Sequence, residues 1–207
     1  MRREFARGSV ILHPGDDAAS VFILLEGRVK ITAPNVHGRE AVLAFLGPGD
    51  LIGELGSIDG LPRSGGVVAL EAVSALAVPG RDFRRLLETR PGVGLALLKL
   101  VAARLRSADT ERADFGAYDV LGRVARRLIE LSERYGSAGA AGVEITLPLT
   151  QEELAGWSGA SREAVSKALT TLRGLGWVET RRRELVISDI GALRTYAGAA
   201  QPPRAGE

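Results

Sequence analysis

The stretch LTQEELAGWSGASREAVSKAL, residues 149–169, carries the start signals of two helices with a glycine between them. Thr150 is followed three positions later by Glu153, the capping-box pattern that opens a helix. Gly159 supplies a tight turn, and Ser161 can cap a second helix. The apolar residues of that second helix recur at helical spacing and are Ala164, Val165, Ala168, Leu169 and Leu172. The stretch therefore predicts a helix-turn-helix with one face left free.

The free face of the second helix has the chemistry of a DNA-reading surface. It carries Arg162, Glu163, Ser166 and Lys167 near its N-terminus. Arginine can donate to the O6 and N7 atoms of guanine, and glutamate can accept from the amino group of cytosine. Because a glutamate weakens the attraction to phosphates, its place between two cations favours base reading over backbone binding. The alternative is an ordinary surface pair between Glu163 and Lys167, one helical turn apart.

A basic hairpin follows the helix pair. The segment GLGWVETRRRELVIS, residues 174–188, reads as two short strands joined by three arginines, Arg181, Arg182 and Arg183. From Gly156 to Arg183 six positive residues stand against two negative ones, whereas the whole chain has a net charge of only +2. The hairpin is therefore predicted to be a wing that contacts DNA phosphates.

The first part of the chain has a different pattern. From Gly8 to about Val78, short apolar runs alternate with turn signals such as HPGD, GPGD and DGLP. This pattern predicts a compact antiparallel barrel or roll. After Pro79 the periodicity becomes helical, and no turn signal occurs between Gly94 and Gly116, so a long helix is expected there.

The long helix is predicted to have two apolar faces. Leu95, Leu97 and Leu100 mark one of them. The other has the alternating three-and-four spacing of a coiled-coil seam and consists of Leu98, Val101, Leu105, Ala108, Arg112 and Phe115. The presence of two apolar faces favours an arrangement in which one face packs on the roll and the other contacts a second copy of the chain. The alternative is a single amphipathic helix that lies on its own domain.

A second domain is expected after the break Gly116-Ala117-Tyr118. Asp119 can cap a new helix at this point. The segment GSAGAAG, residues 136–142, reads as a flexible loop between that helix and the apolar run VEITLPL.

Several classes of protein are excluded or disfavoured by composition. The chain has no cysteine, so disulfides, thiol catalysis and cysteine-held metal are ruled out. Its two histidines, His13 and His37, stand beside turns, and no metal site is expected. Nothing approaches an apolar run of about 18 residues, and the N-terminus lacks the apolar core of a secretory signal. We expect a cytoplasmic protein without membrane contact.

Two motifs resemble one known family. LTQEELAGWSGASREAVSKAL is similar to the DNA-binding segment of the CRP/FNR transcription regulators, the group of the cyclic-AMP receptor protein. GPGDLIGELGSIDGLPRSGG, residues 47–66, resembles the phosphate-binding cassette of that family. The resemblance implies an α+β fold in three parts. These are a jelly-roll-like antiparallel β-roll that binds a cyclic nucleotide (residues 1–90), a long dimerisation helix with a hinge (91–117) and a winged helix-turn-helix (118–207).

The resemblance also implies a nucleotide site in the cassette. Arg63 would pair with the phosphate, assisted by Ser64, while Glu54 would accept from the ribose 2'-hydroxyl. Gly53 would let the backbone approach closely, and Leu55 completes the motif. The alternative is that Glu54 and Arg63 are an ion pair that closes a loop.

The base contact departs from the family pattern. Where the cyclic-AMP receptor offers a threonine and a serine to adenine, this chain has Ala108 and Asp109. Asp109 can accept from an exocyclic amino group, including that of guanine, so cyclic GMP is an alternative effector to cyclic AMP. The start also departs, because MRREFARGSVIL enters the first strand almost directly where relatives usually have a helix.

The DNA segment departs at two positions. Lys167 and Gln151 stand where the cyclic-AMP receptor has arginines, and a lysine loses bidentate geometry. We expect site preference to differ from that of relatives at Lys167. The residues that the resemblance assigns to DNA contact are Thr150, Gln151, Ser161, Arg162, Glu163, Ser166, Lys167, Arg181, Arg182 and Arg183.

The predicted function is that of a homodimeric transcription regulator. The family resemblance implies that it binds a palindrome of TGTGA-like half-sites in double-stranded DNA. It would respond to a cyclic nucleotide, cyclic AMP first, through a hinge near Gly116 to Asp119. RNA polymerase is an expected partner; the nucleotide is an allosteric effector, and no cofactor is expected. The main alternative is a regulator of this family that responds to another small molecule or to none. A sensor that never touches DNA and an enzyme acting on nucleotides are weaker alternatives, since no nucleophile-base pair or Walker loop occurs.

Overall fold

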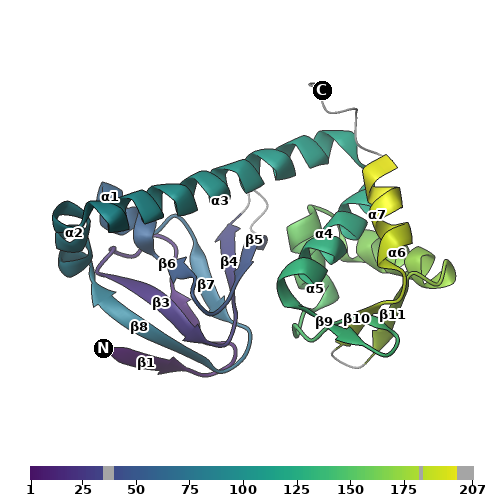
Figure 1. Ribbon diagram of the computed structural model, residues 1–207, viewed down its shortest axis with the longest axis horizontal. Helices are drawn as coiled ribbons and strands as arrows, with labels where there is room; N and C mark the ends of the chain where they lie inside the picture. Colours follow the sequence, from purple (N-terminus) through teal and green to yellow (C-terminus); the bar gives the residue numbers. More distant parts are fainter. Residues whose placement is uncertain (35–39, 182–183, 200–207) are drawn as a thin grey trace. The chain divides into compact units, whose positions relative to one another are not determined.

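The computed structural model describes residues 1–34, 40–181 and 184–199 of the chain (Figure 1). It consists of two compact units, Met1–Arg106 and Ser107–Glu207. Helix α3 (Pro91–Ala117) contributes its first turns to one unit and its last turns to the other. Each unit has its own core and is described separately.

The first unit is built on two four-stranded antiparallel sheets. Their strand orders are β1-β8-β3-β6 and β2-β7-β4-β5, so neighbours in space are mostly distant in sequence. The strands are β1 (Arg2–Phe5), β2 (Val10–Leu12), β3 (Ser20–Glu26), β4 (Val29–Pro34), β5 (Glu40–Leu46), β6 (Leu51–Ile52), β7 (Gly66–Ala69) and β8 (Val73–Pro79). The predicted antiparallel roll is confirmed. The strands were expected from Gly8 onward, but β1 lies ahead of that point and pairs with β8.

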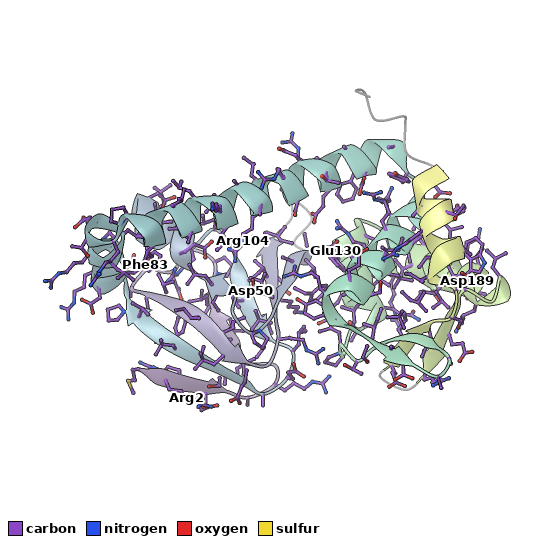
Figure 2. All side chains as sticks on the ribbon, viewed as in Figure 1. Arg2, Asp50, Phe83, Arg104, Glu130 and Asp189 are labelled. Carbon is purple, nitrogen blue, oxygen red and sulfur yellow. The ribbon has the colours of Figure 1, made fainter. Side chains whose placement is uncertain are left out.

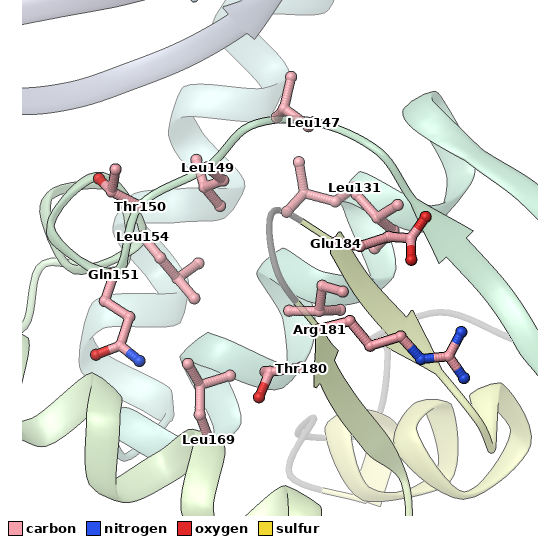
Figure 3. A pocket seen from close by; sticks show the side chains of 12 residues that line it. Leu131, Leu147, Leu149, Thr150, Gln151, Leu154, Leu169, Thr180, Arg181 and Glu184 are labelled. Carbon is pink, nitrogen blue, oxygen red and sulfur yellow. The ribbon is translucent and has the colours of Figure 1, made fainter.

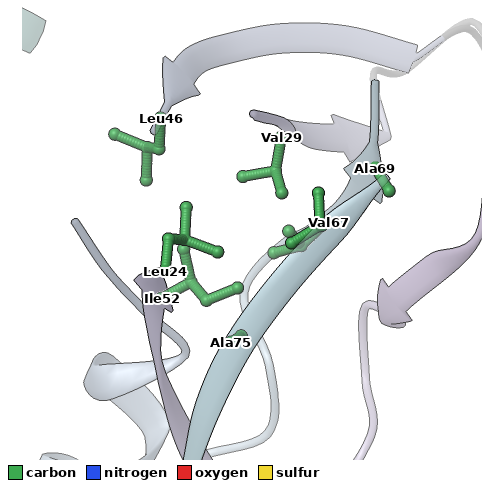
Figure 4. Packing of buried hydrophobic residues seen from close by; sticks show 8 residues of the cluster. Leu24, Val29, Leu46, Ile52, Val67, Ala69 and Ala75 are labelled. Atoms are coloured by element: carbon green, nitrogen blue, oxygen red, sulfur yellow. The ribbon is translucent and has the colours of Figure 1, made fainter. Parts of the chain in front are cut away.

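Short apolar runs from both sheets meet in one core. Leu24 and Ile52 from one sheet pack with Val29 and Val67 from the other, and all four are at most 3% exposed (Figure 4). Successive side chains of a strand point to opposite faces, so every second residue points toward this core. Runs of only a few apolar residues are therefore enough to build it. Two short helices, α1 (Glu54–Asp59) and α2 (Gly80–Thr89), complete the unit together with the start of α3.

Helix α3 runs two residues into the predicted break. Gly116 and Ala117 are helical, and only Tyr118 and Asp119 separate α3 from α4 (Val120–Tyr135). The predicted cap is confirmed, because the Asp119 side chain accepts a hydrogen bond from the Gly122 backbone N–H at 2.8 Å. A single glycine in a helix costs only about 1 kcal/mol, so the flanking residues carry the helix through Gly116.

The second unit joins helices to a small antiparallel sheet of order β11-β12-β10-β9. After α4 its elements are β9 (Gly136–Gly139), β10 (Gly142–Ile145), α5 (Gln151–Ser158), α6 (Arg162–Gly174), β11 (Val178–Arg181), β12 (Glu184–Ile187) and α7 (Ile190–Ala199). Its core includes Val124, Leu128, Leu154 and Leu172, each at most 2% exposed.

The interpretation of residues 136–142 as a flexible loop was wrong. Gly136–Gly139 form β9, an edge strand paired with β10 from Gly139↔Gly142 to Gly136↔Ile145. Backbone hydrogen bonds to the neighbouring strand hold this segment, and they do not depend on side-chain type.

Within the described residues, no helix is long and apolar enough to cross a membrane. The same part of the chain contains no cluster of histidine, aspartate and glutamate side chains able to hold a metal ion.

Candidate functional site

Gly53 forms the turn that leads from β6 into α1. Its φ of 75° and ψ of 17° lie in the left-handed region, which glycine adopts without strain. The space is also filled, because a Cβ here would lie 2.7 Å from Arg63 Nη1 and 2.9 Å from Leu12 Cδ1. The backbone conformation therefore favours glycine at this position, and a Cβ would in addition displace the ends of the Arg63 and Leu12 side chains.

Arg63 is buried against this turn, with 6% of its surface exposed. Its two terminal nitrogens donate to the backbone carbonyls of Gly53 and Ser20. Its Nε has no hydrogen-bond partner among the described residues. Burial lowers the pKa of the Arg63 guanidinium, and the charges of Glu54 and Asp16 oppose that shift. The cassette thus contains a desolvated cation with one donor unused.

Glu54 is 2% exposed and is held by a residue of α3. Arg104 is labelled in Figure 2. Its Nη1 lies 2.6 Å from Glu54 Oε1, and its Nη2 donates to the Leu51 carbonyl at 2.6 Å. The carboxylate of Glu54 is therefore paired with Arg104 and not with Arg63. Sequence reasoning missed Arg104, although an arginine on the helix face that also carries Leu97 and Leu100 was an available signal.

The remaining predicted nucleotide residues lie at the surface. Ser64 and Leu55 are exposed, Leu55 at 46%. Asp109 is an exposed residue of α3 and belongs to the second unit, so its base contact stays a prediction.

The helix-turn-helix begins with the predicted capping box. The Glu153 N–H donates to Thr150 Oγ1 at 3.1 Å, and the Thr150 N–H donates to Glu153 Oε2 at 2.8 Å. Gly159 ends α5 with a φ of 58°. The Ser161 hydroxyl then accepts from the Ala164 N–H at 3.1 Å and caps α6. Local sequence alone therefore determines where both helices begin.

One face of α6 is buried and the other reaches the surface. Val165, Ala168, Leu169 and Leu172 are at most 5% exposed, which confirms the predicted stripe, whereas Ala164 is half-buried. Ser166 is half-buried as well. The polar residues predicted to contact DNA from this helix pair and exposed in the structure are Thr150, Gln151, Ser161, Arg162, Glu163 and Lys167.

The wing consists of β11 and β12, paired from Val178↔Ile187 to Arg181↔Glu184. Arg181 forms an exposed ion pair with Glu179 at 3.1 Å. The other two predicted wing contacts, Arg182 and Arg183, lie outside the described residues. Arg173, counted before only as a charge, joins α6 to the wing through a hydrogen bond to Thr180 Oγ1 at 3.1 Å.

A cavity of about 180 Å³ lies behind the start of α5 and the wing (Figure 3). Leu149, Leu154 and Leu169 are among the apolar residues that line it. Thr150, Gln151 and Arg181 also line it, so three residues predicted to contact DNA border the same largely apolar cavity.

Comparison with known proteins identifies both units. Residues 2–90 match the family described as cyclic nucleotide-binding domain, and residues 122–196 match the Crp-like helix-turn-helix domain. The CRP-like cAMP-activated global transcriptional regulator of Mycobacterium tuberculosis is 36% identical, covering 94% of this chain and 87% of its own. The chain belongs to the CRP/FNR family. As a member of that family it is a DNA-binding transcription regulator, and its relatives are not enzymes.

Two further comparisons agree with membership of the CRP/FNR family. The cyclic AMP receptor protein of Thermus thermophilus is 33% identical over 89% of this chain and 86% of its own. The solved structure of FixK2 from Bradyrhizobium japonicum has a TM-score of 0.84 at 23% identity and covers 95% of this chain and 96% of that one. The predicted α+β architecture of antiparallel roll, long helix and helix-turn-helix is confirmed.

Proposed function

We propose that this CRP/FNR regulator is a homodimer whose affinity for a palindromic operator rises when cyclic AMP binds in the roll. Residues 1–90 would bind the nucleotide, residues 91–117 would join the two copies, and residues 118–207 would bind DNA. The observation that carries the proposal is Arg63, a buried cation whose Nε has no partner among the described residues.

The chemistry of Arg63 favours an anionic ligand. A buried cation without an opposite charge in direct contact is costly, and a phosphate oxygen would supply both the charge and an acceptor. The Gly53 carbonyl accepts from Arg63 and holds it in the cassette, while Ser64 and Leu55 lie at the surface of the same cassette. Relatives described as cAMP-activated support a cyclic nucleotide as that anion.

The ribose would bind at the ion pair between Glu54 and Arg104. Glu54 accepts from Arg104 at 2.6 Å, and a ribose hydroxyl would donate to the same carboxylate. Binding would therefore either add to or rearrange the contact between the cassette and α3. Asp109 would accept from the base, which keeps cyclic GMP as the second nucleotide to test.

Exposed leucines on α3 support the homodimer. Leu98 and Leu105 belong to the predicted seam and are 67% and 62% exposed. On the other predicted face Leu97 and Leu100 are half-buried, while Leu95 is 56% exposed. Large aliphatic side chains repeated every seven residues on an exposed helix face are typical of a coiled-coil contact. The second copy of α3 would cover them.

The DNA contact would come from α6, the start of α5 and the wing. Arg162, Glu163 and Lys167 would read base edges, with Ser166 beside them. Thr150, Gln151, Ser161 and Arg181 would contact phosphates, as would Arg182 and Arg183. The two α6 helices would enter successive major grooves about one helical turn apart, and the bound dimer would act on RNA polymerase.

The same geometry favours one alternative, a regulator that needs another effector or none. Glu54 is already paired with Arg104, and the terminal nitrogens of Arg63 already donate to two carbonyls. Such a site is partly satisfied without a nucleotide.

Calorimetric titration with cyclic AMP and cyclic GMP decides between the two. We expect binding of cyclic AMP to the wild type, with Arg63→Met weakening it at least tenfold, about the worth of one charged hydrogen bond. Arg28→Met is the matched control, because Arg28 pairs with Glu71 elsewhere in the roll. Thermal melting adds a measurement on the unaltered chain, since a bound nucleotide raises its melting temperature. If neither nucleotide produces binding heat and neither raises the melting temperature, the result favours the alternative.

A further inference from the structure

Two arginines of α4, Arg123 and Arg127, lie one helical turn apart and face the same way along the helix. Each of them contacts both the last turns of α3 and the end of α5. All of these residues belong to the second unit, Ser107–Glu207.

Arg127 makes the first of these links. It is 8% exposed, and its Nη1 donates to Glu111 Oε1 on α3 at 3.1 Å and to Glu130 Oε2 on α4 at 3.0 Å. Its guanidinium carbon lies 4.6 Å from the ring centroid of Trp157, on α5, within cation-π range. One side chain thus connects three helices.

Arg123 makes the second link one turn away. Its Nε donates to the Ser158 carbonyl at 2.9 Å, and its Nη1 donates to the Tyr118 carbonyl at 2.8 Å. Its guanidinium carbon lies 5.4 Å from the ring centroid of Phe115 on α3. The Phe115 ring also fills the space beside Gly159, where a Cβ would lie only 2.0 Å from Phe115 Cε1.

The two links repeat at the same interval on both helices. Glu111 and Phe115 are four residues apart on α3, as are Arg127 and Arg123 on α4, so the links stack one turn above another. Asp114 adds a contact between the same helices through an ion pair with Arg126 at 2.7 Å. We call the contacts of Arg123 and Arg127 with Glu111, Phe115 and the end of α5 the arginine ladder.

The ion pair between Arg127 and Glu111 is not well placed to contribute much to folding stability. Burial raises the pKa of the Glu111 carboxyl despite the opposing charge of Arg127, so ionising Glu111 costs more in the folded protein than in the unfolded chain. Buried ion pairs often add little net stability, while their geometry specifies one arrangement. The geometry of this pair therefore favours a role in orientation.

We propose that Arg123 and Arg127 are positioning residues for DNA reading, because they make residues 111–117 of α3 one rigid piece with the helix-turn-helix. The joint through which a ligand signal passes would then lie before Glu111, not at Gly116 to Asp119. Any rotation of α3 at Glu111 would be passed through the ladder to Ser158 and Gly159, and so to the start of α6. The ligand-response part of this inference rests on the proposed function.

DNA binding with and without cyclic AMP tests the inference in the full chain. The probe is a labelled duplex with TGTGA-like half-sites, followed by fluorescence anisotropy. Glu111→Gln should reduce the gain in DNA affinity caused by cyclic AMP at least about threefold, within the range seen for residues that carry coupling. The melting temperature should not fall. Glu133→Gln is the matched control, since Glu133 pairs with Arg194 of α7 at 3.0 Å and not with an arginine of the ladder; its gain should equal that of the wild type.

Hydrogen exchange provides a readout that needs no nucleotide. Glu111→Gln and Arg123→Met should speed amide exchange in residues 111–118 and also in residues 157–160, whereas Glu133→Gln should change neither segment. Unchanged exchange in residues 157–160 of both ladder variants would overturn the inference. If the wild type shows no response to cyclic AMP but exchange changes as expected, the ladder stands and the choice of effector fails.

Discussion

Glu54 of the cassette and Arg104 of α3 form an ion pair with 2.6 Å between Oε1 and Nη1, in which the carboxylate side chain is 3% exposed. Arg104 also donates to the Leu51 carbonyl, so its guanidinium closes the start of the cassette from two sides. A ligand that engages Glu54 therefore acts directly on a residue of the helix that leaves the roll.

Removing one partner of this pair should be costly. Arg104→Met leaves the buried carboxylate of Glu54 without its cation, and we expect a loss of unfolding free energy of about 3 kcal/mol. Chemical denaturation measures it. The double variant Arg104→Met/Glu54→Leu removes both charges and should recover most of the loss. A double variant no more stable than Arg104→Met would contradict the pairing as the cause.

Gly53→Ala should damage the cassette more than its backbone angle alone explains. The matched control is Gly60→Ala, because Gly60 has the same φ of 75° but nothing within 4 Å of its Cβ position. The control should cost about 1–2 kcal/mol, the penalty for the left-handed region. Gly53→Ala should cost more and also weaken cyclic AMP binding, as measured by denaturation and calorimetry. Equal losses of stability and unchanged binding would show that contact with Arg63 is unimportant.

The pair between Arg28 and Glu71 should make stability depend on pH. The hydrogen bond from Arg28 lowers the pKa of the Glu71 carboxyl below 4.5 in the folded protein. The unfolded chain therefore binds the proton more readily, so the pair contributes stability above the ordinary pKa and loses it as pH falls through the folded pKa. Glu71→Gln should lower the melting temperature at neutral pH, and this difference from the wild type should shrink in acid. A difference independent of pH would disprove the assignment.

Lys167→Arg should sharpen discrimination at the base pair that residue 167 reads. Arginine restores bidentate geometry toward guanine, which is worth about 1–3 kcal/mol against a wrong base. Competition among duplexes with single-base changes in each half-site measures the effect. Lys99→Arg, the same substitution on an exposed residue of the first unit, should leave the preference unchanged. If no position of the half-site responds to Lys167→Arg, residue 167 does not read a base.

Local sequence signals predicted the helix-turn-helix well, because caps and turns act within a few residues. Thr150, Ser161 and Gly159 each take the predicted role through a contact with a near neighbour. The roll also followed from local alternation. Both predictions depend on interactions between residues that are close together in the sequence.

The features that sequence reasoning missed depend on distant partners. Arg104 meets Glu54 across 50 positions of the chain, so its helical spacing with Leu97 and Leu100 indicates the helix face but not the partner. Strand β9 has the composition of a linker and is ordered by hydrogen bonds to β10. Arg123 and Arg127 look like ordinary charges of an exposed helix until the fold brings α3 and α5 beside them.

The contact of Phe115 with Gly159 bears on how regulators of this kind can be recombined. A fusion that exchanges the DNA-binding part at Asp119 would give the new helix-turn-helix a foreign aromatic ring, or none, beside its turn. A fusion point at Ser107 would transplant Phe115 and Glu111 together with Arg123 and Arg127. The natural module for building chimaeric regulators from this chain therefore begins inside the long helix, ahead of the point where that helix ends.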